Sequence, residues 1–186
     1  MPFPHTVLDA NVLAQAYVRD LLLDADALGL FHVRWTDAIL HDTRRVYIHE
    51  LGRDPAAIDA LLTAMRREFP HATITGYEKL ITAMTVDPKD RHVAAAATWA
   101  QADFVTFNLR HFLPRDLAPF GVQAVRPDLF LATLAEDHQE ALTQIVRVQA
   151  GRRTNPPLSP DAFLVRLARP LPRFSAIIGA ALHEEG

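Results

Sequence analysis

Short apolar runs alternate with helical patterns along the first 127 residues, and this alternation restricts the fold more than any other feature of the sequence. The apolar runs stand at residues 6–8, 31–35, 103–107 and 122–125. Between them, apolar residues recur at the three- and four-residue spacing of helices. Strands that alternate with helices indicate a parallel sheet whose strands are joined by helical crossovers. The sequence therefore predicts an α/β fold with a central parallel sheet.

An acidic residue ends the first of these runs. Asp9 follows Val7 and Leu8, and apolar residues resume at Val12. This pattern predicts a strand that places Asp9 at its carboxyl end, with a helix starting just after it. In open α/β sheets, ligands and catalytic groups gather at that edge. The competing interpretation is that Asp9 only caps the following helix, since Asp is a frequent N-cap residue.

The pattern changes beyond residue 127, where no further strand is predicted. The segments are a helix at 128–149, a polar proline-rich connector at 151–160, and short helices at 161–168 and 174–183. These short helices cannot fold alone, because isolated helices of this length are marginal in water. We therefore predict an α/β domain at residues 1–127 and a helical C-terminal extension at 128–186, which packs on the α/β body or serves a partner.

Composition limits the class of protein. Hydrophobic residues make up 49% of the chain and charged residues 22%, as in ordinary globular proteins. There is no cysteine, which excludes disulfides and thiolate metal ligands. The first residues lack the basic start and long apolar stretch of a secretory signal, and no run approaches the roughly 18 apolar residues of a membrane span. We expect a cytoplasmic protein with no membrane segment.

The formal net charge of −3 argues against a protein that coats DNA or RNA in bulk. It does not exclude a nuclease. Such enzymes gather acidic residues to hold a metal ion, and the charge of the ion attracts the phosphate.

Four polar residues recur at equivalent points of the strand–helix units. Asp9 and Asn108 follow strands, Asp42 lies on the helix after the second strand, and Asp90 starts an alanine-rich helix. Strand ends and the adjacent helix starts share one edge of a parallel sheet, so these side chains are expected to converge. Three carboxylates in one hollow repel one another unless they share a cation, and hard oxygen ligands favour Mg²⁺ or Mn²⁺. Spacing alone leaves the alternative open, because acidic helix starts are common.

Other polar residues carry weaker signals. No two of the nine histidines have a metal-binding spacing with a supporting acid, although His41 and His92 flank the predicted site. A surface or packing role competes with substrate contact for both. Arg44, Arg91 and Arg110 stand beside the acids and are candidates for binding RNA phosphates, with a solvated or salt-bridged role as the alternative.

Four segments, taken in order, resemble the PIN-domain ribonucleases, specifically the VapC-like toxins of bacterial toxin–antitoxin pairs. The segments are Leu-Asp-Ala-Asn-Val-Leu at 8–13, Arg-Trp-Thr-Asp-Ala-Ile-Leu-His-Asp at 34–42, Asp-Pro-Lys-Asp-Arg-His-Val-Ala-Ala-Ala at 87–96 and Val-Thr-Phe-Asn-Leu-Arg-His-Phe at 105–112. The Asn-Pro-Pro-Leu-Ser-Pro connector and its following helices are also similar to one branch of that family. The resemblance implies a three-layer α/β/α PIN-like fold.

The resemblance also implies roles for the four polar residues. Asp9 matches the first metal-binding Asp of the family, and Asp90 matches its third acid. Asp42 falls where the family usually has a Glu, which is one methylene longer. Asn108 stands where many members have a fourth Asp, which implies a hydrogen bond to metal-bound water or a weak metal contact. The implied metal ligands are Asp9, Asp42 and Asp90, and the implied ion is Mg²⁺ or Mn²⁺.

The neighbours of these residues receive supporting roles from the same resemblance. Asn11 and Thr106 would orient Asp9, and Asp87 would assist Asp90 or simply cap the helix. The implied function is a metal-dependent endoribonuclease that leaves a 5′-phosphate and a 3′-hydroxyl. The implied partners are an RNA substrate and a cognate antitoxin that blocks the acidic site. A homodimer is a further hypothesis.

Two other functions compete with this one. A phosphatase of the haloacid dehalogenase type also opens with an Asp after a strand, but it needs a second Asp two residues on, where this chain has Asn11. No GDGxxD-like segment follows later in the chain. The second alternative is a catalytically weak or inactive PIN-fold module that binds RNA or protein, having lost strong metal binding through the changes at Asp42 and Asn108.

Overall fold

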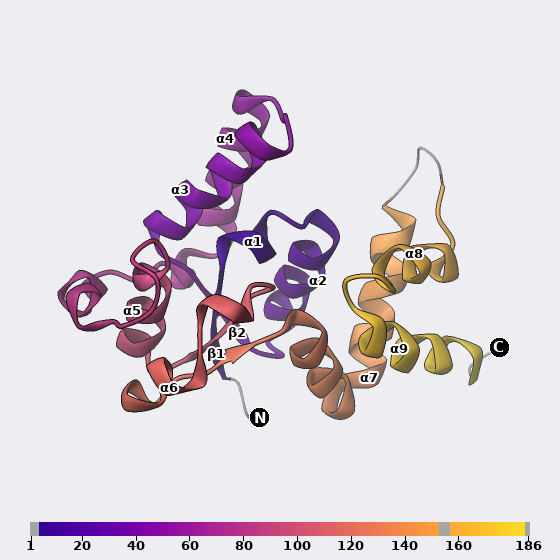
Figure 1. The fold of residues 1–186 in the computed structure, drawn as a ribbon. Coiled ribbons are helices and arrows are strands. Elements are labelled where there is room, and N and C mark those ends of the chain that lie inside the picture. Colours follow the sequence, from indigo (N-terminus) through magenta and orange to yellow (C-terminus); the bar gives the residue numbers. More distant parts are fainter. Residues whose placement is uncertain (1–3, 153–156, 185–186) are drawn as a thin grey trace. The chain divides into compact units, whose positions relative to one another are not determined.

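The structure, a computed structural model, describes residues 4–152 and 157–184 and contains a four-stranded sheet in which all strands are parallel (Figure 1). The strands are β1 (His5–Leu8), β2 (His32–Arg34), β3 (Asp103–Val105) and β4 (Ala124–Val125), in the order β2-β1-β3-β4. Helices connect them and follow them in the chain. The predicted α/β fold with a central parallel sheet and a helical C-terminal part is confirmed, and it is consistent with a PIN-like fold.

The strand order places a switch point between β1 and β3. The chain first crosses from β1 to β2 on one side, and then returns to place β3 and β4 on the other side of β1. Ligands in open α/β sheets bind beyond the carboxyl ends of the strands at such a point. Leu8 and Val105 are paired in register, and the residues that follow them are Asp9 and Thr106. Topology alone therefore brings these two polar side chains to the switch point.

By compactness, the chain divides into two units. The described part of the first unit is residues 4–15 and 31–125, and that of the second is residues 16–30, 126–152 and 157–184. Residues 16–30 thus cluster with the C-terminal helices. Compactness does not decide whether residues 1–127 and 128–186 fold as separate domains, and that division stays a prediction.

Two of the longer helices of the first unit begin at capping side chains. Thr36 caps α3, because its Oγ1 accepts a hydrogen bond from Ile39 N at 3.1 Å. Asp54 caps α4, because its Oδ2 accepts a hydrogen bond from Ala57 N at 2.9 Å. The α-helices are α1 (Ala10–Leu13), α3 (Asp37–Arg45), α4 (Pro55–Glu68), α5 (Arg91–Ala100) and α6 (Pro114–Leu117). A π-helix, η1 (Val46–Glu50), extends α3, and the 3₁₀ helices are η2 (Pro70–Ala72), η3 (Tyr77–Ala83), η4 (Leu109–His111) and η5 (Ala118–Phe120).

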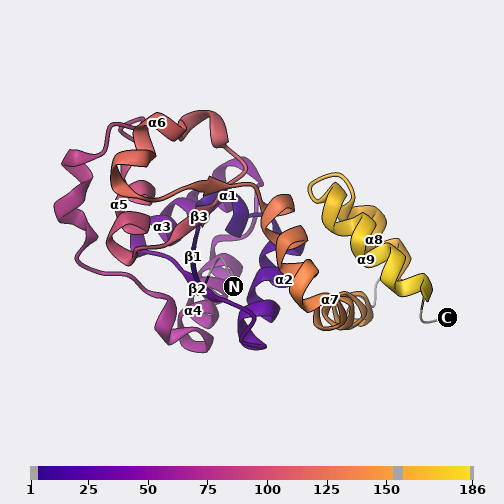
Figure 2. The same cartoon turned by 90° about the horizontal axis from the view of Figure 1, so that it is seen from below.

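Helix α5 packs against β1 and β3, and Figure 2 shows it alongside these strands. Its residues 93–97, one valine and four alanines, are all buried. Side chains of this size let a helix approach a sheet closely. The strand residues Leu8 and Phe104, which point to opposite faces of the sheet, are fully buried as well. This close packing fixes the start of α5, and with it Asp90, relative to the edge of the sheet.

The second unit is helical. It consists of α2 (Ala16–Ala27), α7 (Pro127–Gly151), α8 (Pro160–Leu167) and α9 (Pro172–Glu184). Asp128 Oδ1 accepts hydrogen bonds from Arg173 N and Phe174 N, at 2.9 and 3.1 Å, and so joins the start of α7 to the start of α9. The short helices predicted after residue 127 are present, but the single helix predicted at 128–149 is kinked: His138 in α7 has a non-helical backbone (φ −135°, ψ 37°) that separates two helical segments. Residues 153–156 of the predicted connector lie outside the described residues. Within 4–152 and 157–184, no helix combines the length and apolar character needed to cross a membrane.

Candidate active site

Asp9 caps a helix and also takes part in a polar cluster at the end of β1. Its carboxylate Oδ1 accepts a hydrogen bond from Ala10 N at 2.7 Å, so the residue does cap α1. The other oxygen, Oδ2, accepts hydrogen bonds from Asn11 Nδ2 at 2.6 Å and from Thr106 Oγ1 at 2.7 Å. The residue is 7% exposed. One oxygen of Asp9 therefore completes a helix, while the other belongs to a polar cluster at the switch point.

Asn11 and Thr106 join the start of α1 to the loop after β3. Thr106 Oγ1 accepts hydrogen bonds from Asn11 Nδ2 and from Asn108 N, both at 3.0 Å. Asn11 Oδ1 accepts a hydrogen bond from Phe107 N at 3.0 Å. Both side chains thus contact Asp9 and the backbone beyond β3 at once. This arrangement fixes the orientation of the Asp9 carboxylate.

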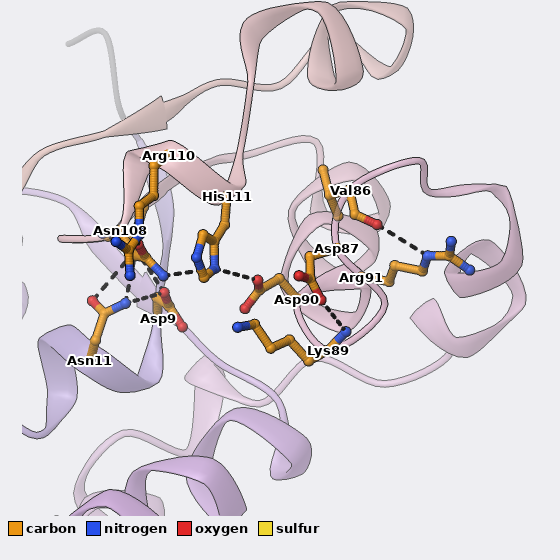
Figure 3. Close-up of polar contacts among 11 residues, drawn as sticks. Asp9, Asn11, Val86, Asp87, Lys89, Asp90, Arg91, Asn108, Arg110 and His111 are labelled. Atoms are coloured by element: carbon orange, nitrogen blue, oxygen red, sulfur yellow. Dashed lines mark hydrogen bonds and ion pairs between the residues drawn. The ribbon is translucent and has the colours of Figure 1, made fainter.

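Asp90 lies across the site from Asp9 and contacts a histidine (Figure 3). Its Oδ2 is 2.8 Å from His111 Nδ1, and the same nitrogen is 2.8 Å from Asn108 Nδ2. Asn108 Oδ1 accepts a hydrogen bond from Arg110 Nε at 3.1 Å. The side chains of Asp90 and His111 are each 19% exposed, so both are partly accessible to solvent. Polar contacts at η4 therefore connect four residues of the site, namely Asp90, Asn108, Arg110 and His111.

Asp42 is more peripheral than the other two acids. Its side chain is 31% exposed, and Oδ2 lies 3.4 Å from His92 Nε2 on α5. Oδ1 lies 3.6 Å from Arg45 Nε and 3.9 Å from His41 Nδ1. The charge of His92 also lowers the pKa of the Asp9 carboxyl. Asp42 therefore reaches the site on the side of α5, with a histidine next to its carboxylate.

The structure does not gather every predicted residue into one tight cluster. Among the described residues, the carboxylate oxygens of Asp9, Asp42 and Asp90 do not all lie within 4.8 Å of one another. Asp87 is exposed, and its Oδ1 accepts a hydrogen bond from Lys89 N at 3.2 Å, a local turn contact. The three acids therefore line one edge of the sheet without touching, and Asp87 caps the turn before α5.

Burial is the largest influence on Asp9 and raises the pKa of its carboxyl. The negative charge of Asp90 acts in the same direction. Hydrogen bonds from Thr106 and from Ala10 N, together with His92, lower the pKa but do not outweigh burial. Among the described residues, no cationic side chain forms an ion pair with Asp9. A cation beside this carboxylate would therefore stabilise its charged form.

The oxygens at this edge fit a hard metal ion. The carboxylates of Asp9, Asp42 and Asp90 and the amide oxygen of Asn108 are the donor types that Mg²⁺ and Mn²⁺ prefer. Asp9 also has the fixed hydrogen bonds that orient ligands in metal sites. The donor chemistry thus fits a divalent cation, although the three acids would have to draw closer to share one ion.

We expect the stability of the metal-free protein to depend on pH through Asp9. Because the pKa of Asp9 is raised in the folded state, the folded protein binds this proton more tightly than the unfolded chain does. The charged Asp9 therefore destabilises the folded protein at neutral pH. This destabilisation decreases as the pH falls through the raised pKa of Asp9 towards the ordinary Asp value. Denaturant unfolding in EDTA at about pH 7.5 and about pH 5 should show the wild type gaining stability relative to Asp9→Asn. A relative loss at the lower pH would contradict the burial argument.

Comparisons with known proteins support the resemblance to VapC-like proteins. A family model described as the VapC50 C-terminal domain matches residues 127–180. The chain is also 37% identical over 102 residues to a protein of Mycobacterium tuberculosis (strain ATCC 25618 / H37Rv) that is named as a candidate ribonuclease, VapC50. That alignment covers 54% of this chain and 60% of the relative, so it spans less than two thirds of the relative's length. The resemblance to VapC-like proteins is therefore confirmed.

Proposed function

We propose that this chain is a metal-dependent endoribonuclease, a VapC-like toxin that hydrolyses RNA phosphodiesters. The observation that carries the proposal is the buried Asp9 carboxylate at the switch point, which is oriented by Asn11 and Thr106 and lacks an ion-pair partner among the described residues. A buried carboxylate in this position is costly unless a cation binds beside it. The similarity to a relative named as a candidate ribonuclease supports the same conclusion.

Asp9, Asp42 and Asp90 are the residues that would hold Mg²⁺ or Mn²⁺, with Asn108 beside them. When bound, such an ion neutralises charge on the phosphodiester and lowers the pKa of a water molecule. The protein supplies the orientation of the ligands. Thr106 and Asn11 hold Oδ2 of Asp9, and the hydrogen bond from Ala10 N holds Oδ1. Asp42, which stands where the VapC-like family usually has the longer Glu, has its carboxylate beside His92.

The arginines near the acids differ in their freedom to contact RNA. Arg44 forms a two-pronged contact with Asp59 of α4, at 2.6 and 3.0 Å, which holds it on the α3–α4 pair. Arg91 Nε donates a hydrogen bond to Val86 O at 3.2 Å. Arg110 is exposed, and only its Nε contacts Asn108 in the described structure. We propose that the outer nitrogens of Arg110 contact a phosphate of the substrate.

We propose further that a cognate antitoxin binds this chain and blocks the acidic edge, as the similarity to VapC-like proteins implies. A cytoplasmic location and a homodimer are predictions of the same kind. Co-expression with the product of a small adjacent open reading frame would test the antitoxin. The expected result is a stable complex that no longer cleaves RNA.

The proposed activity is tested by incubating the purified chain with mixed RNA and Mn²⁺. We expect cleavage by the wild type, no cleavage in EDTA, and loss of cleavage in Asp90→Asn, which removes one charge from the site. Asp37→Asn is the matched control, since Asp37 is 74% exposed and forms its ion pair with Arg66 of α4 rather than with a residue of the site. This control should cleave like the wild type.

Other outcomes would decide between the alternatives. If the wild type binds RNA or a protein partner and never cleaves, the chain is a PIN-fold binding module. If Asp90→Asn cleaves as fast as the wild type, the activity does not come from this site, and the proposal is wrong.

A further inference from the structure

One side chain of the site has no role in the function proposed above. His111 ends η4, and its Nδ1 lies 2.8 Å from Asp90 Oδ2 and 2.8 Å from Asn108 Nδ2. Figure 3 shows its ring between these two residues. The ring therefore bridges the acid that starts α5 and the amide that follows β3.

Asp90 depends on this contact for its orientation. The residue occupies the N-cap position of α5, yet within the described chain its side chain makes no capping hydrogen bond. An Asp that caps a helix typically contributes about 0.5–2 kcal/mol. Asp90 forgoes that contact, and its carboxylate is directed to His111 instead. The orientation of Asp90 is thus set from η4 rather than from its own helix.

His111 is itself held in place. The next residue, Phe112, is buried, and its ring packs edge-to-face on that of Phe104 in β3, with centroids 4.7 Å apart. This contact ties η4 to the centre of the sheet. A group that fixes another side chain must be fixed by its own surroundings, and His111 meets that condition.

The two hydrogen-bond partners of His111 Nδ1 make opposite demands on this nitrogen, because one is a donor and the other an acceptor. Arg110 donates to Asn108 Oδ1, which sets the amide so that its Nδ2 faces the ring. Nδ2 only donates, whereas a carboxylate oxygen only accepts, so a single ring nitrogen satisfies one of the two at a time. The contact to the carboxylate is the stronger, because hydrogen bonds to charged groups exceed neutral ones. Nδ1–H therefore donates to Asp90.

We propose that His111 is a positioning residue that holds the Asp90 carboxylate towards Asp9 in readiness for a divalent cation. This inference rests on the proposed function, because it assumes that Asp90 is a metal ligand. It concerns the orientation of a ligand by a hydrogen-bond donor, and such donors typically change metal affinity or activity 10–100-fold.

The test measures Mn²⁺ binding to the metal-stripped full chain by calorimetry. We expect His111→Ala to weaken Mn²⁺ binding by about 10–100-fold. We expect His111→Asn to restore most of the affinity, since its amide N–H sits close to the position of Nδ1. His111→Gln places its amide one carbon farther away and should restore less. His49→Ala, which removes an exposed histidine on η1, should bind like the wild type.

Thermal unfolding of each variant without metal separates positioning from packing. A purely structural role predicts that affinity follows stability, whereas positioning predicts that His111→Asn recovers Mn²⁺ binding beyond any recovery of stability. If His111→Ala does not fold, the comparison of His111→Asn with His111→Gln carries the test. Equal Mn²⁺ affinity in these two variants, or wild-type affinity in His111→Ala, would overturn this inference and leave the proposed function standing. A wild type that binds no Mn²⁺ would overturn the proposed function and this inference with it.

Discussion

Replacing Asp9 with asparagine is expected to reduce RNA cleavage and Mn²⁺ affinity by more than about 100-fold. Loss of a residue that merely orients a metal ligand costs about 10–100-fold, and loss of the central ligand should exceed that. The fold should persist, because asparagine retains an oxygen to accept the hydrogen bond from Ala10 N and is itself a good N-cap residue. Initial cleavage rates in Mn²⁺, calorimetric Mn²⁺ binding and circular dichroism measure the three quantities.

The control for this substitution is again Asp37→Asn, on the exposed surface of α3. It removes the same charge from the chain and leaves the polar cluster intact. Wild-type cleavage by a well-folded Asp9→Asn protein would mean that Asp9 is a structural cap and not a catalytic group.

Replacing Phe104 with alanine is expected to lower the free energy of unfolding by about 3–5 kcal/mol. Phe104 is fully buried in β3, and its ring meets that of Phe112 at an angle of 70°. The substitution leaves a cavity under the sheet and removes an aromatic pair that contributes about 0.5–1.5 kcal/mol beyond area burial. Urea unfolding in EDTA measures the loss.

Two variants control for this effect. Leu113→Ala shortens a side chain that is 37% exposed and should change stability by less than about 1 kcal/mol. Phe104→Leu keeps most of the apolar volume and should lose less than Phe104→Ala. If Phe104→Ala loses no more than Leu113→Ala, the centre of the core is not at this strand.

Most of the elements were predictable, because their signals are local. The capping residues Thr36 and Asp54 marked the starts of α3 and α4, and apolar runs marked the strands. The stretch 78–86 showed no clear periodicity, and most of it forms the 3₁₀ helix η3, whose three-residue repeat has no strong sequence pattern. The association of residues 16–30 with the C-terminal helices was not predictable either, because an amphipathic helix looks the same whichever core it covers.

The site was predictable in composition but not in its contacts. Sequence order and topology placed Asp9, Asp90 and Asn108 at one edge, because the carboxyl ends of parallel strands meet there. The contact of Asp42 with His92 and that of Asp90 with His111 join segments far apart in the chain. No spacing rule relates such pairs. His111 lies within one of the motif segments, yet its position there gave no sign that its ring meets Asp90.

The two uses of Asp9 have a consequence for interpreting related sequences. One oxygen of its carboxylate completes a helix whether or not the other ever meets a metal ion. A chain that had lost all nuclease activity would still need a capping side chain at this position, and asparagine would supply it without the buried charge. A capping side chain there is accordingly weak evidence that a relative cleaves RNA. An acid at position 90 together with a donor at position 111 is the more informative sign, because that pair contributes nothing to capping α5.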